Sequence, residues 1–257
     1  MVLETISANV APPTQPQLKA ADAGPKFTEK SIAAGFESIN AKFANPDWEV
    51  HVDAMESLQD MVDRGAGSHA SFMSLFVRYL REPLIEQCID IRVAINKVAC
   101  ATVSLLSVKL GAGFSKVADI FVKNLVKQVR DGVVQCVVDF SSECVMTIIA
   151  NTHAGRIIPG LVQIYGDDKS PVCRAHCMDC IAYILQRWGE PILRKHSEAL
   201  TSVLKTGLSD ASPAARSAAR DCFCHMQKRW PAKAANLQTA LDPTTARQVG
   251  ALPDTSG

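Results

Sequence analysis

The sequence predicts an all-α protein built as an α-solenoid of five to six stacked repeats, and three observations lead to that prediction. Apolar residues recur every three or four positions, as at Val117, Phe121, Leu125 and Val129, which is the period of an amphipathic helix. No segment shows the sustained alternation expected of a β-strand. Turn-forming clusters divide the helical stretches at regular intervals, which is typical of a repeat architecture.

The composition is that of a globular chain with a large core. The 257 residues are 47% apolar, and 27 Lys and Arg balance 26 Asp and Glu to a net charge of +1. This balance gives no general reason to expect nucleic acid or an acidic membrane as a partner. The longest uncharged apolar stretch, 98–108, falls well short of the roughly 20 residues that span a bilayer, and the N-terminus lacks the pattern of a secretory signal. We therefore expect a cytosolic protein with reduced cysteines and no membrane span.

The chain divides into three segments. Residues 1–25 are rich in Pro, Ala, Gln and Thr and carry no apolar period, which indicates a disordered leader. Residues 253–257 have the same character and are expected to form a flexible tail. Residues 26–252 are then a single repeat domain.

The repeat length follows from the turn clusters, which lie at 45–47, 88–90, 130–132, 166–171 and 209–213. A polar residue recurs near the start of the helix that follows each cluster, namely His51, Lys97, Gln135, Arg174 and Arg216. Their separations of 46, 38, 39 and 42 residues are close to the length of HEAT or armadillo units, each a pair of antiparallel helices. In such an array the short turns within the repeats align along one edge. We expect the functional residues on that edge.

Trp48 opens the second helix of the first repeat, directly after Pro46 and Asp47. A capping Asn or Asp would suffice to start the helix, so folding alone does not require an indole there. Two interpretations remain open. The indole packs onto its own helix as a hydrophobic staple, or it is an exposed anchor for a protein partner.

The fourth repeat carries Cys173, Cys177 and Cys180 at a C-x3-C-x2-C spacing that some enzymes use to hold an iron–sulfur cluster. Ser170 and Pro171, however, are suited to start a helix that runs to about Arg187. On that helix the three cysteines and Ile184 form one buried stripe, so core packing is favoured over a cluster.

Arg174 lies beside this stripe in the first helical turn, on the edge formed by the intra-repeat turns. An Arg at a helix N-terminus opposes the helix dipole. It is therefore either solvated or kept for an acidic partner. Arg216 and Arg220 occupy the same kind of position in the fifth repeat, which favours the partner.

The other candidate motifs have plainer explanations. The segment 111–116, GAGFSK, lacks the spacing of a phosphate-binding loop and is expected to be an inter-repeat turn. Cys222 and Cys224 point in different directions on a helix, which disfavours a shared metal. No serine, histidine or carboxylate set indicates catalysis. The sequence therefore predicts no catalytic residue, cofactor or metal.

The order of four segments resembles a known family. The segments are DWEVHVDAMESL, KVACATVSLLSVKLG, KSPVCRAHCMDCIAYILQRW and LSDASPAARSAARDCF, followed by LDPTTARQ. From Phe43 to Leu252 they are similar to the TOG domains, which are tubulin-binding HEAT arrays, and within them to the CLASP type.

The resemblance implies a flat paddle whose intra-repeat turns bind αβ-tubulin and regulate microtubule dynamics without enzymatic activity. It assigns tubulin contacts to Trp48, Ile95, Lys97, Lys169, Arg174, Arg216 and Arg220. The third turn, where many members carry a lysine, has Gln135 here, which leaves that contact in doubt. No nucleic acid, membrane or small-molecule partner is implied. The implied location is the cytoplasm and cytoskeleton, including a cilium or flagellum.

Two other classes of function remain. A generic HEAT scaffold for another protein would share the solenoid but would have no use for a tryptophan and basic residues on a common edge. An enzyme that uses the cysteines is the more distant alternative. Binding to purified tubulin distinguishes the first of these from the tubulin hypothesis.

Overall fold

The computed structural model describes residues 27–250. The predicted leader, 1–25, and the predicted tail, 253–257, lie outside these residues. Every regular element within 27–250 is helical, which confirms the all-α prediction. The long helices are α1 (Glu29–Phe43), α2 (Trp48–Asp63), α5 (Val93–Leu110), α6 (Ala118–Asp131), α7 (Gln135–Thr152), α8 (Ile157–Asp167), α9 (Pro171–Arg187), α11 (Ser197–Leu208) and α12 (Pro213–Arg229). The shorter elements are η1 (Ala66–Ser68), α3 (Phe72–Tyr79), α4 (Arg81–Cys88), η2 (Gly111–Lys116), α10 (Glu190–Arg194), α13 (Pro231–Thr239) and α14 (Pro243–Gly250).

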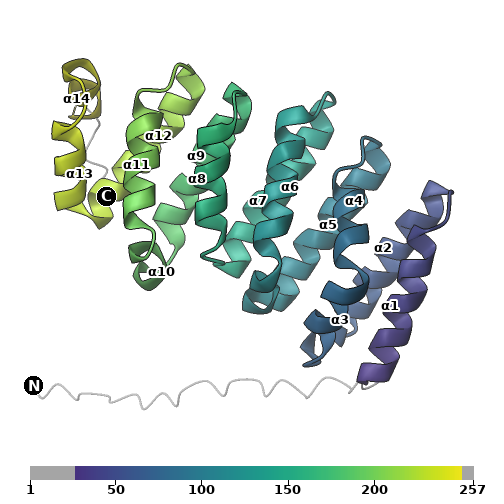
Figure 1. The fold of residues 1–257 in the computed structure, drawn as a ribbon. Coiled ribbons are helices and arrows are strands. Elements are labelled where there is room, and N and C mark those ends of the chain that lie inside the picture. The colour runs from purple at the N-terminus through teal and green to yellow at the C-terminus, as the bar shows by residue number, and fades with distance from the viewer. Residues whose placement is uncertain (1–26, 251–257) are drawn as a thin grey trace, which may run out of the picture.

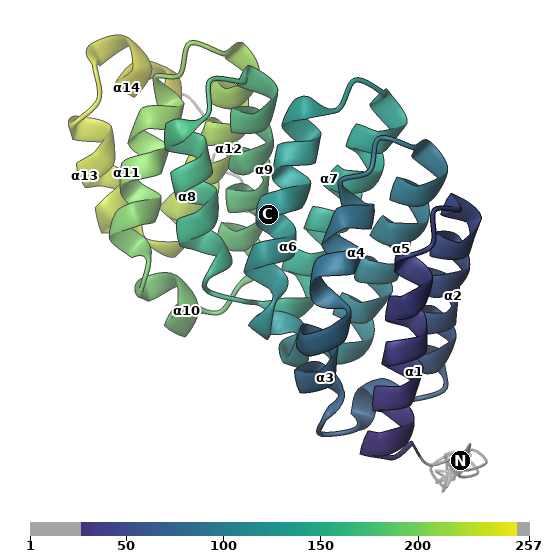
Figure 2. The ribbon, with the colours of Figure 1, turned by 45° about the vertical axis from the view of Figure 1, so that its right-hand side comes forward.

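The helices form antiparallel pairs that stack side by side into a solenoid (Figure 1). The pairs are α1/α2, α3–α4/α5, α6/α7, α8/α9, α11/α12 and α13/α14, where α3 and α4 together make the first helix of the second repeat. The first helices form one layer and the second helices form the other, as the turned view shows (Figure 2). The five to six predicted repeats are therefore confirmed within 27–250.

One continuous apolar core runs between the two layers. Each repeat contributes buried side chains, among them Phe36, Phe76, Phe121 and Trp188. The indole Nε1 of Trp188 donates a hydrogen bond of 3.0 Å to the carbonyl of Ile149 in the preceding repeat. Since neighbouring repeats bury each other's apolar faces, no repeat is an independent folding unit.

Helix α9 confirms the core interpretation of the fourth-repeat cysteines. It spans Pro171–Arg187, as the sequence predicts, and Ser170 Oγ accepts a capping hydrogen bond from the Cys173 N–H. Cys173, Cys177 and Cys180 are fully buried. The Cys180 sulfur lies 3.8 Å from His176 Nε2, and burial lowers the pKa of His176 to about 4, so this imidazole is neutral at physiological pH.

Helix α5 and the 3₁₀ turn η2 together are long and apolar enough to cross a membrane by length and composition alone. The sequence predicted no such segment because Lys97 and Lys109 divide it. In the structure α5 packs between α2 and α7, and Ile95, Ala99 and Val103 are fully buried. The apolar side chains of α5 are therefore explained by its place as a central helix of the solenoid.

Candidate functional site

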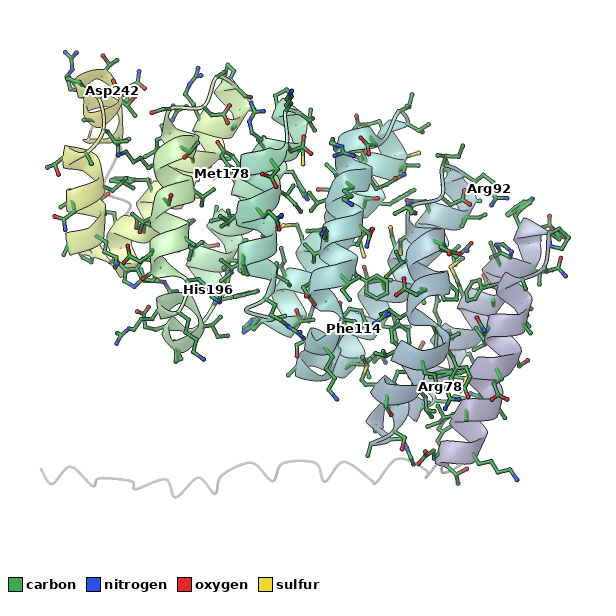
Figure 3. The ribbon with its side chains drawn as sticks, viewed as in Figure 1. Arg78, Arg92, Phe114, Met178, His196 and Asp242 are labelled. Carbon is green, nitrogen blue, oxygen red and sulfur yellow. The ribbon has the colours of Figure 1, made fainter. Side chains whose placement is uncertain are left out.

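The turns within the repeats lie on one edge of the molecule, the upper edge in Figure 1. We call this the intra-repeat edge and number its turns by repeat: turn 1 (44–47), turn 2 (89–92), turn 3 (132–134), turn 4 (168–170) and turn 5 (209–212). Figure 3 shows Arg92 of turn 2 on this edge and His196 on the opposite one. Most residues assigned to the site by resemblance lie in these turns or in the first four residues of the helices that follow them. Lys97 is the fifth residue of α5, and Arg220 is the eighth residue of α12.

Turn 1 presents Trp48 as the first residue of α2. The helix is capped by Asp47, whose Oδ1 accepts a 3.0 Å hydrogen bond from the Glu49 N–H. Asn45 Oδ1 in turn accepts one of 2.9 Å from the Asp47 N–H. Trp48 is 39% exposed, so the indole lies at the surface, as the anchor interpretation requires.

At turn 2 the prediction for Ile95 is wrong. Helix α5 begins at Val93, which places Ile95 in line with Ala99 and Val103 on the core face, and Ile95 is fully buried. The most exposed apolar residue of this turn is Ile91, at 84%, beside the less exposed Ile89. The sequence signal for Ile91 was its place between two polar residues, Asp90 and Arg92, directly after the predicted turn cluster at 88–90.

The two basic residues around turn 2 differ in whether they form an ion pair. Lys97 is exposed and forms no ion pair with any described residue. Arg92 pairs with Asp90 at 2.6 Å, and this contact lowers the pKa of Asp90. Lys97 therefore remains available to a partner, whereas Arg92 is neutralised locally.

Turn 3 has no basic side chain of its own. Gln135 is exposed, and its amide donates a 2.8 Å hydrogen bond to Asp139. The turn presents Val133, which is 98% exposed, and Val134, which is 44% exposed. Arg130, at the end of α6, pairs with Asp168 of turn 4 at 3.1 Å.

Arg174, between turns 4 and 5, is not a free surface residue, which corrects both alternatives set out for it. Its Nε and Nη2 donate to the two carboxylate oxygens of Asp210 at 2.8 and 2.9 Å. Its Nη1 donates to the carbonyls of Asp168 and Lys169 at 3.3 and 2.8 Å. The side chain is 17% exposed. Arg174 therefore ties turn 4 to turn 5.

Asp210 accepts most of the hydrogen bonds that connect turns 4 and 5. It also accepts a 2.6 Å hydrogen bond from the Tyr165 hydroxyl and one of 2.7 Å from the Ser212 N–H. The hydrogen bonds from Arg174 are the main reason that the pKa of Asp210 falls to about 2. Burial, with the hydrogen bond to Asp210, raises the pKa of Tyr165. The carboxylate is therefore charged and fully satisfied at neutral pH.

Lys169, Arg216 and Arg220 form no ion pair with residues 27–250. Lys169 is exposed, and Arg216 and Arg220 are half-buried. Arg216 Nη1 donates to the carbonyls of Asp210 and Ala211 at 2.5 and 2.9 Å, so its guanidinium lies against the backbone of turn 5. The positive charge of the edge is thus concentrated at Lys97, Lys169, Arg216 and Arg220.

The arrangement suits protein docking. In the described part of the chain, no three His, Cys, Asp or Glu side chains are grouped so that they could hold a metal ion. The intra-repeat edge instead combines a surface tryptophan, exposed aliphatic side chains and a few unpaired cations. These are the side chains that anchor and orient protein partners.

Solved TOG domains share this fold. The TOG3 domain of Drosophila melanogaster Mini spindles matches with a TM-score of 0.65, covering 83% of this chain and 91% of that one at 11% identity. A structure on tubulin recruitment and assembly by microtubule polymerases with TOG domain arrays matches with a TM-score of 0.67. It covers 83% of this chain and 44% of that one at 18% identity.

The chain belongs to the CLASP N-terminal family, whose model matches residues 29–250. The CLIP-associated protein of Arabidopsis thaliana is 28% identical over 225 residues, which is 87% of this chain. The chain spans 16% of the length of that relative. The resemblance to a CLASP-type TOG domain is therefore confirmed.

Proposed function

We propose that this domain binds the αβ-tubulin heterodimer through the intra-repeat edge and regulates microtubule dynamics as a non-enzymatic protein. The observation that carries the proposal is the position of Trp48, an indole at the surface of turn 1 that neither caps a helix nor lies in the core. On the same edge lie the unpaired cations Lys97 and Lys169.

Membership of the family supports tubulin as the partner. TOG domain arrays of microtubule polymerases are described as recruiting tubulin, and another TOG array is described as regulating microtubules in the primary cilium. A generic scaffold would use the same solenoid, but it would not require a surface tryptophan and unpaired cations on one edge. The corresponding location is the microtubule cytoskeleton.

The proposed contacts have different roles. Burying an indole at the centre of an interface supplies much of the affinity, and its truncation typically costs about 2 kcal/mol or more. Exposed charges at the rim act mainly on the association rate and on orientation. We therefore assign anchoring to Trp48 and steering to Lys97, Lys169, Arg216 and Arg220. Arg174 acts indirectly, because it holds turns 4 and 5 together.

The test is size-exclusion chromatography of the domain with purified tubulin, with Trp48→Ala beside the parent. A loss of about 2 kcal/mol corresponds to a roughly thirtyfold weaker affinity, so the Trp48→Ala complex should be lost at low micromolar concentration. Its helical circular dichroism should match that of the parent, because the Asp47 cap remains. A matched control is Val108→Ser, which alters an exposed apolar residue on α5 outside the edge. If folded Trp48→Ala bound tubulin like the parent, another surface would be the docking site.

A further inference from the structure

Exposed apolar side chains are concentrated on the intra-repeat edge. Within 27–250, eight large apolar side chains are exposed, and seven of them lie in turns 1 to 4 or within two residues of them. These seven are Trp48, Ile89, Ile91, Val93, Val133, Val134 and Val172, and the eighth is Val108. Single exposed apolar residues are ordinary on a soluble protein, whereas a group on one edge marks an interaction surface.

Turn 3 has a valine at the position where a capping residue would stabilise the start of α7. Asp47, Ser170 and Ser212 cap α2, α9 and α12 with side-chain hydrogen bonds. The N-cap of α7 is Val134, which makes no such bond. Valine is among the poorer N-cap residues, and Ser, Asp or Asn would stabilise the helix start. Local folding therefore does not explain the choice of valine.

The backbone of turn 3 is closely packed at Gly132, the residue before Val133. A Cβ added at Gly132 would lie 2.9 Å from the carbonyl oxygen of Gln128 and 2.6 Å from Val138 Cγ2. The chain must therefore have glycine here to turn so closely against α6 and α7. A tight turn with a stiff, β-branched residue at its tip loses little conformational entropy on binding.

We propose that turn 3 is an apolar specificity contact. Val133 and Val134, continued by Ile91 and Val172 in the neighbouring repeats, bury against an apolar patch of the tubulin surface. This contact replaces the basic third-turn contact that the resemblance leaves in doubt at Gln135. The inference rests on the proposed function, because it names the chemistry of the same edge.

An apolar contact and a charged contact differ in how salt affects their contribution to tubulin binding. Salt screens exposed charges, with a Debye length of about 10 Å at 0.1 M that shortens as salt is added. Apolar burial is not weakened in this way. Loss of a valine should therefore weaken binding by the same factor at low and high salt, whereas loss of Lys169 should matter chiefly at low salt.

The test compares three serine variants and Lys169→Ala by affinity for purified tubulin at about 0.05 and 0.5 M NaCl. Val133→Ser should weaken binding about tenfold at both salt concentrations, the effect of burying one valine side chain. Val134→Ser should also weaken binding, while the new cap raises the midpoint of thermal unfolding by about 2–4 °C. Val108→Ser, off the edge, should bind like the parent. Lys169→Ala should approach the parent at high salt.

The outcomes separate this inference from the proposed function. If the parent binds, Trp48→Ala does not, and Val133→Ser and Val134→Ser bind like the parent, then tubulin docks on the edge without turn 3 and the inference is overturned. A valine effect that disappears at high salt overturns it as well. If the parent does not bind tubulin at all, the proposed function is wrong, and the inference about turn 3 is overturned with it.

Discussion

Arg174 shows how a side chain that looks free in sequence can be occupied in the structure. Its guanidinium is held by Asp210, and the two side chains are 17% and 5% exposed. Removal of one partner of a buried ion pair costs several kcal/mol, because the other charge is left uncompensated. Weak tubulin binding by an Arg174 variant would therefore report the displacement of turns 4 and 5 and not the loss of a direct tubulin contact. Lys169 is the better position at which to test charge.

Asp210→Asn should destabilise the domain at neutral pH by about 2–4 kcal/mol. The folded-state pKa of Asp210 is about 2, below the unfolded value of about 3.9. The carboxylate's contribution is thus fully present above about pH 4 and is lost as the pH falls towards 2. Urea unfolding of parent and variant at pH 7 and near pH 2.5 measures both effects.

The pH dependence is the critical result for Asp210. The gap in unfolding free energy between parent and Asp210→Asn should narrow at the lower pH, and an equal gap at both would contradict the ionic role. Asp60→Asn is the control, because Asp60 is 62% exposed in its pair with Arg64. Such a surface pair contributes between zero and about 1 kcal/mol.

At the scale of the helix, local signals in the sequence account for where α2, α9 and α12 begin. Asp47, Ser170 and Ser212 each accept a hydrogen bond from the first turn of the following helix. Pro171 and Pro213 occupy the first positions of α9 and α12, where a missing N–H is not needed. Helices α5 and α7 start without a side-chain cap, and their turns carry the most exposed aliphatic residues.

The stripe of thiols on α9 leads to a prediction for cysteine labelling. All nine cysteines are free, and seven are buried, while Cys136 and Cys224 are half-buried. Burial raises the pKa of Cys180, so its reactive thiolate form is scarce. A water-soluble disulfide reagent should therefore label Cys136 and Cys224 in the native protein and the other seven only on unfolding.

Counting the labelled thiols by mass spectrometry checks this prediction. Cys136→Ser should remove one of the two fast-reacting thiols. Rapid native labelling of Cys177 and Cys180 would show that the α9 stripe is accessible and would return the C-x3-C-x2-C motif to reactive chemistry.

At the scale of the whole molecule, stability depends on the stacking of repeats. The last pair, α13/α14, covers the outer side of α11/α12, and Ala234 and Leu237 are buried with Phe223 and Met226 in one core. A solenoid needs such a terminal unit, because an uncovered repeat exposes its apolar face.

Deletion of 231–250 should therefore lower the midpoint of thermal unfolding and expose apolar surface on α12. Circular dichroism during heating and binding of an apolar fluorescent dye measure the two effects. Lys233→Ala is the control, because it removes only the surface ion pair of α13 with Glu198, whose contribution is small. An unchanged midpoint in the deletion variant would mean that the first five pairs are sufficient.

The sequence by itself determined the class of fold, the range of five to six repeats, the approximate places of the intra-repeat turns and the bounds of α9. These features follow from signals within a few residues of each other, such as the apolar period that places Cys173 and Cys177 on one face. The same local signals placed Trp48, Lys97 and Lys169 on the intra-repeat edge, where the structure has them.

Only the tertiary structure decided which of these edge residues are free. Arg174 and Asp210 are 36 residues apart in the chain, and their pairing exists because two repeats stack in one register. Ile95 and Ile91 differ in exposure because α5 begins at Val93, between them. Val133 is exposed directly after Gly132, where the chain passes too close to Gln128 and Val138 to admit a Cβ. Since solvent exposure and ion pairing depend on surfaces brought together by packing, the amino-acid pattern of one segment cannot determine them.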